Sequence, residues 1–102
     1  MTNLFHLPEL PIADELTTVL TNNANVRIER IVSTGQVTGW LDQEEEEFVA
    51  LLDGRAVIDF EDGKAVTLEK GDTLTIKPHE RHRVSYTSSS PPCVWLCVFY
   101  IP

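Results

Sequence analysis

The pattern of apolar and polar positions along the chain favours strands over most of its length. From Val26 onward, apolar and polar residues alternate with a period of two, and turn signals recur about every eight to ten residues. This cadence is typical of short antiparallel strands that form an all-β sandwich or barrel. We expect the later strands at about 65–69, 73–77, 82–87 and 94–101.

Two Asp-Gly pairs punctuate the middle of this alternating region. Asp53-Gly54 and Asp62-Gly63 are hairpin-type turn pairs, because Gly tolerates the positive φ that tight primed turns require. Between them Ala56, Ile58 and Phe60 share one face of a predicted strand. We therefore expect hairpins at both pairs.

The first 25 residues differ in character from the rest. Pro8 and Pro11 interrupt an extended lead-in, and apolar residues then recur at helical spacing between Ile12 and Leu20. This spacing predicts a short helix over 13–21 that packs on the outside of the strands. The 102 residues therefore form a single predicted domain, with a lead-in and helix over 1–25 and a β-barrel over 26–101.

Charge and length narrow the classes of partner. Eight Lys and Arg against sixteen Asp and Glu leave a net charge of −8, which repels phosphate backbones, so we expect no nucleic-acid partner. The longest apolar run, Val94 to Ile101, is far shorter than the roughly 20 residues of a spanning helix. The N-terminus also lacks the basic and apolar regions of a signal peptide. We expect a cytoplasmic protein with no membrane partner.

The C-terminal run carries two further expectations. Val94 to Ile101 is apolar on both faces, which predicts that its outer face meets either a second chain or the N-terminal helix, and we expect a homodimer through this face. Cys93 and Cys97 lie four residues apart on this strand, about 13 Å, which is too far for a disulfide between them. We expect both to be small apolar core residues.

Two short segments hold most of the candidate chemistry. Residues 40–47 read Trp-Leu-Asp-Gln-Glu-Glu-Glu-Glu, with five carboxylates in six positions from Asp42 to Glu47. Repulsion within such a run is relieved by solvent or by a bound cation, and solvent is favoured for Glu44 and Glu45.

The second segment runs from Lys77 to Val84 and contains two of the three histidines. His82 begins a predicted strand and shares its face with Val84 and Tyr86, so it points toward the interior. On this evidence alone, it is either a hydrogen-bonded core residue or a metal ligand. His79 lies in the preceding turn, where a solvent-facing role is the simplest expectation.

The chain from about Gly35 to Val84 resembles the small single-domain cupins. The first cupin motif reads His-x-His, three or four residues, Glu, six residues and Gly, and Glu47 and Gly54 stand in that last relation. The second motif reads Gly, five residues, Pro-x-Gly, two residues and His, and Gly71 and His82 fit its ends. The resemblance implies a double-stranded β-helix, or jelly-roll, barrel.

The resemblance also implies a candidate metal site in a modified form. Counting back from Glu47 with a four-residue spacer puts Trp40 and Asp42 at the two histidine positions. The implied ligands are then Asp42, Glu47 and His82, with His79 as a further candidate. A site of carboxylates and imidazoles suits Mn, Fe, Ni or Zn.

The same resemblance implies a pocket beside this site. Trp40, Gln43, His79 and Tyr86 are expected to line it. The motifs resemble those of a subgroup of uncharacterised cupins, so the resemblance implies no defined reaction.

Three functions follow from these observations. The first is a metal-dependent enzyme acting on a small molecule, the second a non-catalytic barrel that binds or senses a small molecule, and the third a dimeric interaction protein that has lost the metal site. The sequence shows no nucleophile with its base, phosphate loop or cofactor fingerprint, so it identifies no catalytic residue.

Overall fold

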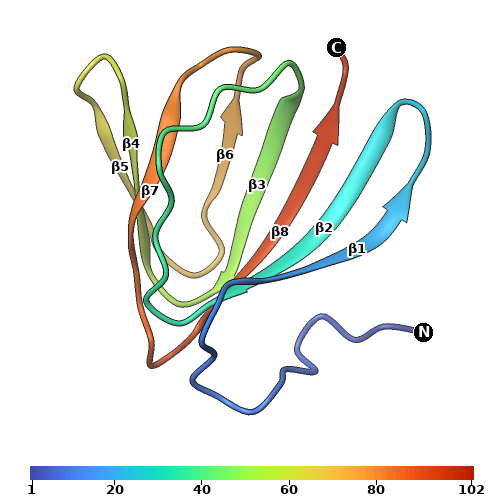
Figure 1. Cartoon of the computed structure of the whole chain (residues 1–102), viewed down its shortest axis with the longest axis vertical. Helices are drawn as coiled ribbons and strands as arrows, with labels where there is room; N and C mark the ends of the chain where they lie inside the picture. The colour runs from blue at the N-terminus through green and yellow to red at the C-terminus, as the bar shows by residue number, and fades with distance from the viewer.

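The computed structural model describes residues 1–102, and eight strands form two antiparallel sheets. The larger sheet has the order β1-β2-β8-β3-β6, and the smaller has the order β5-β4-β7. The strands are β1 (Leu16–Asn22), β2 (Val26–Ser33), β3 (Glu46–Asp53), β4 (Ala56–Phe60), β5 (Ala65–Leu68), β6 (Thr73–Ile76), β7 (His82–Thr87) and β8 (Cys93–Tyr100). In Figure 1 the two sheets approach each other at the bottom of the view and diverge toward the top.

The all-β prediction is confirmed, and the predicted strands lie within a residue of the observed ones. The predicted closed barrel is wrong, because no ladder of hydrogen bonds joins the two sheets. The turn at Asp53-Gly54 shows how the chain passes between two separate sheets. Instead of forming a hairpin within one sheet, it carries the chain from β3 of the larger sheet to β4 of the smaller one. Asp62-Gly63 does connect a hairpin, between β4 and β5.

The predicted helix over 13–21 is also wrong. Residues Leu16–Asn22 form β1, which pairs antiparallel with β2, and a β-bulge interrupts the register between Val19 and Thr21. The extra residue of the bulge is Leu20, so two apolar residues stand side by side and the sequence loses its period of two. Residues 16–22 form a strand because the edge of β2 offers them backbone hydrogen-bond partners.

The structure has no helix that could span a membrane.

The core lies between the two sheets. Alternate residues of β3, β4 and β8 meet there, because successive strand side chains point to opposite faces. The buried cluster consists of Val49, Leu51, Ala56, Ile58, Phe60, Leu68, Ile76, Cys93, Trp95, Cys97 and Phe99. Cys93 and Cys97 belong to it as free thiols, which confirms their assignment as core residues.

Candidate functional site

A cavity of about 110 Å³ lies between the two sheets. Strands from both sheets contribute its apolar wall, and the segment between β2 and β3 contributes further side chains. The apolar wall consists of Ile31, Leu41, Val49, Ile58, Ile76, Val84, Trp95, Cys97 and Phe99. The polar residues facing the cavity are Glu15, Thr38, Gln43, Glu47 and His82.

Glu47 and His82 are the most deeply placed polar groups of this cavity. Glu47 is 7% exposed on β3, and His82 is 2% exposed at the start of β7. The ring nitrogen Nδ1 of His82 lies 2.8 Å from the backbone oxygen of Glu80. Since a carbonyl can only accept, Nδ1 carries a proton, and the second ring nitrogen, Nε2, is not engaged by this bond. No residue of the chain hydrogen-bonds Nε2.

The environment of Glu47 favours its protonated form. Burial raises the pKa of Glu47, and this effect exceeds the opposing effects of the Cys97 thiol, the His82 ring and the Gln43 amide. Gln43 donates from Nε2 to Oε1 of Glu47 over 3.2 Å. A carboxyl with a raised pKa and an imidazole that line one cavity are groups able to accept or donate a proton.

The segment that leads to Glu47 lies along the free edge of β7. Leu41 and His82 exchange backbone hydrogen bonds of 2.7 and 3.1 Å, and the nitrogen of Thr38 donates to the oxygen of Val84 over 3.0 Å. Side chains in such an extended segment alternate between two faces. Leu41 and Gln43 consequently line the cavity, whereas Trp40 and Asp42 do not.

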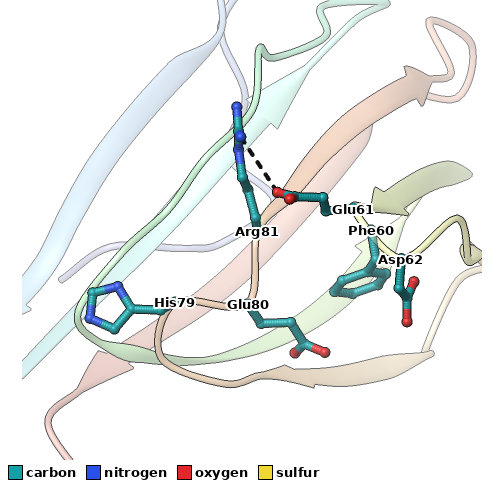
Figure 2. A pocket seen from close by; sticks show the side chains of 6 residues that line it. All are labelled: Phe60, Glu61, Asp62, His79, Glu80 and Arg81. Carbon is teal, nitrogen blue, oxygen red and sulfur yellow. Dashed lines mark ion pairs between the residues drawn. The ribbon is translucent and has the colours of Figure 1, made fainter.

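The expected ligand Asp42 therefore lies outside the cavity, where it pairs with His79. The two exposed side chains meet at 2.7 Å, between Oδ1 of Asp42 and Nδ1 of His79. His79 also borders a separate open hollow, shown in Figure 2, beside the ion pair of Arg81 and Glu61. The structure thus brings together Glu47 with His82, and Asp42 with His79, as two separate pairs.

Two other expected pocket residues also lie outside the cavity. Trp40 is 39% exposed, and the guanidinium of Arg83 stacks over its ring at 4.5 Å from the centroid. Tyr86 is 48% exposed, because the register shift between Val57 and Ile58 in the ladder of β4 and β7 changes the alternation of side chains along β7. Among the expected pocket residues, Gln43 faces the cavity.

Glu15 is a cavity residue that no sequence pattern indicated. It precedes β1, and its carboxylate accepts a hydrogen bond of 3.4 Å from the Ser33 hydroxyl. Ser33 in turn accepts from Nε1 of Trp95 over 3.2 Å, so this chain of contacts reaches into the core. Burial raises the pKa of Glu15 as well. Only the pairing of β1 with β2 brings this residue near Glu47.

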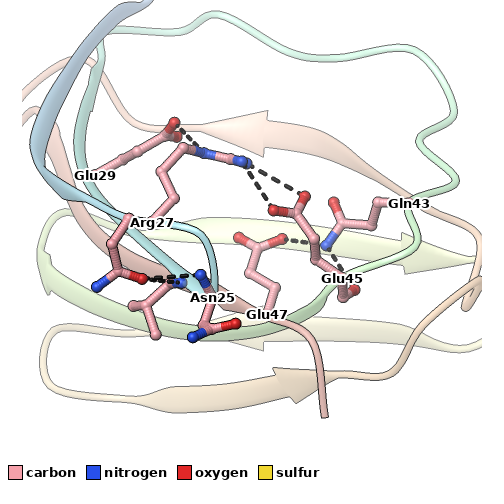
Figure 3. A network of polar contacts seen from close by, with 8 residues as sticks. Asn25, Arg27, Glu29, Gln43, Glu45 and Glu47 are labelled. Carbon is pink, nitrogen blue, oxygen red and sulfur yellow. Dashed lines mark hydrogen bonds and ion pairs between the residues drawn. The ribbon is translucent and has the colours of Figure 1, made fainter.

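A polar network holds Gln43 in place at one end of the cavity. As Figure 3 shows, Arg27 of β2 bridges Glu29 and Glu45, with nitrogen–oxygen distances of 2.8 Å to each. The Arg27 guanidinium also stacks over Phe99 of the cavity wall at 4.3 Å. Gln43 lies next to Glu45 in this network and donates to Glu47 (Figure 3). The network therefore ties the segment before β3 to β2.

The residues that face the cavity do not fit the metal site of the cupin motif. With a spacer of three residues before Glu47, the two histidine positions of the motif fall on Leu41 and Gln43, the two residues that line the cavity. Leucine offers no ligand atom, and a neutral amide is a weak one. No group of three His, Cys, Asp or Glu side chains lies close enough to hold a metal ion. Ion binding by Asp42, Glu47 and His82 stays a prediction.

Comparison with known proteins agrees with this fold. Residues 29–99 match the family described as Cupin domain. A structure from Ralstonia eutropha, provisionally named a mannose-6-phosphate isomerase, is 33% identical and superposes with a TM-score of 0.93 over 100% of this chain and 98% of that one. No curated protein matches the chain.

More distant structures share the fold alone. A cupin superfamily protein from Desulfitobacterium hafniense is 20% identical, with a TM-score of 0.81 over 93% of this chain and 84% of that one. An RmlC-like cupin from Shewanella frigidimarina is 16% identical, with a TM-score of 0.75 over 86% and 77%. The family match covers most of the chain, so the chain belongs to the cupin family.

Proposed function

We propose that this cupin binds a small organic molecule in the cavity between its sheets, with Glu47 and His82 holding the polar group of the ligand. The observation that carries the proposal is the pair itself: Nε2 of His82 has no partner in the chain, and the Glu47 carboxyl is buried beside an apolar wall. An apolar cavity with a few convergent polar groups is the usual form of a small-molecule site.

The size and charge of the cavity limit the ligand. A volume of 110 Å³ corresponds to roughly three or four waters at their liquid volume, or to a group of about five or six heavy atoms. Its lining includes the carboxyls of Glu15 and Glu47 but no Lys or Arg. A neutral or cationic ligand therefore matches the cavity better than a phosphorylated one. The sugar phosphate in the name of the Ralstonia relative lacks a cationic partner here.

Fluorescence of Trp95 offers a direct test. Trp95 lines the cavity and Trp40 does not, so Trp40→Phe leaves Trp95 as the single tryptophan reporter. This variant is titrated with neutral, cationic and anionic small metabolites, including mannose 6-phosphate. We expect saturable quenching or a spectral shift with neutral or cationic compounds.

Matched variants then assign the site. Glu47→Gln keeps the shape of the side chain, and Asp42→Asn makes the same change outside the cavity. A hydrogen bond between neutral groups is worth about 0.5–1.5 kcal/mol, so Glu47→Gln should weaken binding about 2-fold to 10-fold. Asp42→Asn should leave binding unchanged. Equal effects of both variants, or binding of mannose 6-phosphate alone, would contradict the proposal.

The same titration with Mn²⁺, Fe²⁺, Ni²⁺ and Zn²⁺ tests the metal-dependent alternative. Uptake of one ion that is lost in Asp42→Asn, Glu47→Gln and His82→Gln would support the metal site predicted from the motif. It would also require the segment before β3 to turn Asp42 inward, since its carboxylate now pairs with His79.

A second candidate function is proton transfer on the bound molecule. It is favoured by the raised pKa of Glu47 together with the His82 ring in the same cavity. Incubation of a bound compound in D₂O tests it by NMR. Deuterium incorporation next to a carbonyl, abolished in Glu47→Gln, would support an acid–base enzyme, whereas binding without exchange would support a carrier or sensor.

A further inference from the structure

Arg30 is a buried cation without an anionic partner. It lies in the middle of β2 on the outer face of the larger sheet, since its neighbour Ile31 faces the cavity. Only 6% of its surface is exposed. Its guanidinium donates to the backbone oxygens of Leu4 and His6, at 3.4 and 2.8 Å, and to the Thr18 hydroxyl at 3.3 Å.

The other four arginines of the chain differ from Arg30 in having anionic partners. Each of them has a carboxylate within ion-pair distance: Arg27 pairs with Glu29 and Glu45, Arg55 with Glu69, Arg81 with Glu61 and Arg83 with Asp59. These four are also less buried than Arg30. In a chain with sixteen acidic residues, the most buried arginine is thus the one whose acceptors are all neutral.

The hydrogen-bonding capacity of Arg30 is also incomplete. Its Nε has no partner, and among side-chain nitrogens and oxygens whose own surface is fully shielded it is the one without a partner. Nη2 uses one acceptor, the hydroxyl of Thr18, and therefore keeps a second hydrogen free. A guanidinium binds carboxylate or phosphate oxygens through two adjacent N–H groups. A buried charge with unused donors is costly unless an anion compensates it.

A hollow of about 420 Å³ adjoins Arg30 and offers room for such an anion. It is lined by Arg30 and by residues of the N-terminal segment, including Asn3 and His6. The oxygen of the Asn3 side chain accepts from the nitrogen of Phe5, which leaves its amide NH₂ available as a donor. The imidazole of His6 is a further donor. No acidic residue lines the hollow.

We propose that this hollow, which we term the Arg30 site, binds an oxyanion, a carboxylate or a phosphate group, through the guanidinium of Arg30 with support from Asn3 and His6. The site is on the opposite face of the larger sheet from the cavity of Glu47 and His82, so it is independent of the function proposed above. In this proposal the oxyanion takes the unused hydrogen of Nη2, and Nε, which is buried and has no partner, supplies the second donor once the guanidinium turns toward the anion. The source is either a free small anion or a carboxylate of a second copy of the chain.

The test uses the whole protein with inorganic phosphate and acetate as probes. Titration at constant ionic strength, with chloride as the balancing ion, is followed by the ¹⁵N–¹H signal of Arg30 Nε. We expect a saturable shift of this signal and no comparable shift at Arg83, whose Nε already faces Asp59 at 3.1 Å. At free anion ten times its Kd, linkage predicts a rise in Tm of about 5–10 °C above the chloride control.

Variants separate binding from a purely structural role of Arg30. His6→Gln and Asn3→Ala leave the core intact and should weaken anion binding several-fold with little change in Tm when no anion is present. Arg30→Lys keeps the charge but loses the planar pair of donors, so it should abolish the saturable response, while Arg83→Lys should retain it. If Arg30→Lys does not fold, the two N-terminal variants still decide the question.

Two results would overturn the proposal. One is an Arg30 signal that does not respond to phosphate or acetate up to tens of millimolar, and the other is a response that chloride reproduces at equal ionic strength. If the signal instead shifts with protein concentration in the absence of added anion, and sedimentation shows a dimer, the oxyanion is a carboxylate of a second copy. That result would support the site and assign its source.

Discussion

The cavity between the sheets can be tested by comparing two core truncations, Ile58→Ala and Leu51→Ala. Both residues lie on strands of the core, and both are buried, at 2% and 0% exposure. They differ in one respect, because Ile58 borders the cavity and Leu51 does not. Each substitution removes three carbon groups, so the two are matched in the apolar surface that they lose.

The expected costs follow from the transfer and cavity contributions. Removing three buried carbon groups costs about 2.4 kcal/mol in transfer free energy at either position. At Leu51 a new void of roughly 80 Å³ adds about 2 kcal/mol, at about 24 cal/mol per Å³. At Ile58 the space joins an existing cavity that solvent can fill, so this second contribution is small. We expect Leu51→Ala to cost about 4 kcal/mol and Ile58→Ala about 2–3 kcal/mol.

Urea unfolding followed by far-UV circular dichroism measures both free energies, with equal m-values as the check that neither change alters the unfolding mechanism. The difference corresponds to about 5–15 °C in Tm for a domain of this size. Equal costs, or a larger cost for Ile58→Ala, would refute a cavity beside Ile58. An Ile58→Val variant should cost only about 0.5–1.5 kcal/mol and controls for the loss of β-branching.

Three further predictions concern pH, backbone and thiols. Burial raises the native pKa of Glu47 above its unfolded value, so its contribution to stability is fully present at low pH and is lost as pH rises through the native pKa. Glu47→Gln should therefore gain stability over the parent by about 1.36 kcal/mol per pH unit within that window, and a constant difference in urea titrations from pH 4 to 8 would contradict this. Gly54→Ala should cost at least about 2 kcal/mol more than Gly63→Ala in the same assay. Both glycines have φ near +90°, but a methyl group at Gly54 would lie 2.7 Å from a backbone oxygen and at Gly63 meets nothing. The buried thiols of Cys93 and Cys97 should react with an aromatic disulfide reagent only as fast as the protein opens, because burial also raises the pKa of Cys97, and rapid native labelling would show this assignment to be wrong.

This chain departs from the first cupin motif at the two histidine positions. In this chain the cavity positions of the first motif are filled by Leu41 and Gln43, and Gln43 donates to Glu47. An amide at this point satisfies the buried carboxyl without a cation, as buried polar groups require. The proposed ligand then takes the place in the cavity that a metal would otherwise occupy, and Glu47→Gln with Asp42→Asn distinguishes the two cases.

The sequence by itself determined the strands and the two deepest polar residues. The period of two fixes which residues of β2 through β8 form strands, since it reflects a local property of the pleat. The motif spacings identified Glu47 and His82, which the fold places on β3 and β7 facing one cavity. Local pattern sufficed because strand type, turn residues and side-chain alternation all depend on near neighbours.

Tertiary structure decided the features that depend on pairing between distant segments. The bulge at Leu20 gives β1 an apolar spacing like that of a helix, and only the edge of β2 resolves the choice. The chain could place either Leu41 or Asp42 in the cavity, depending on a spacer of three or four residues. The hydrogen bonds between Leu41 and His82 select the first. Since a shift of one residue exchanges the two faces of an extended segment, this long-range pairing determines the chemistry of the cavity.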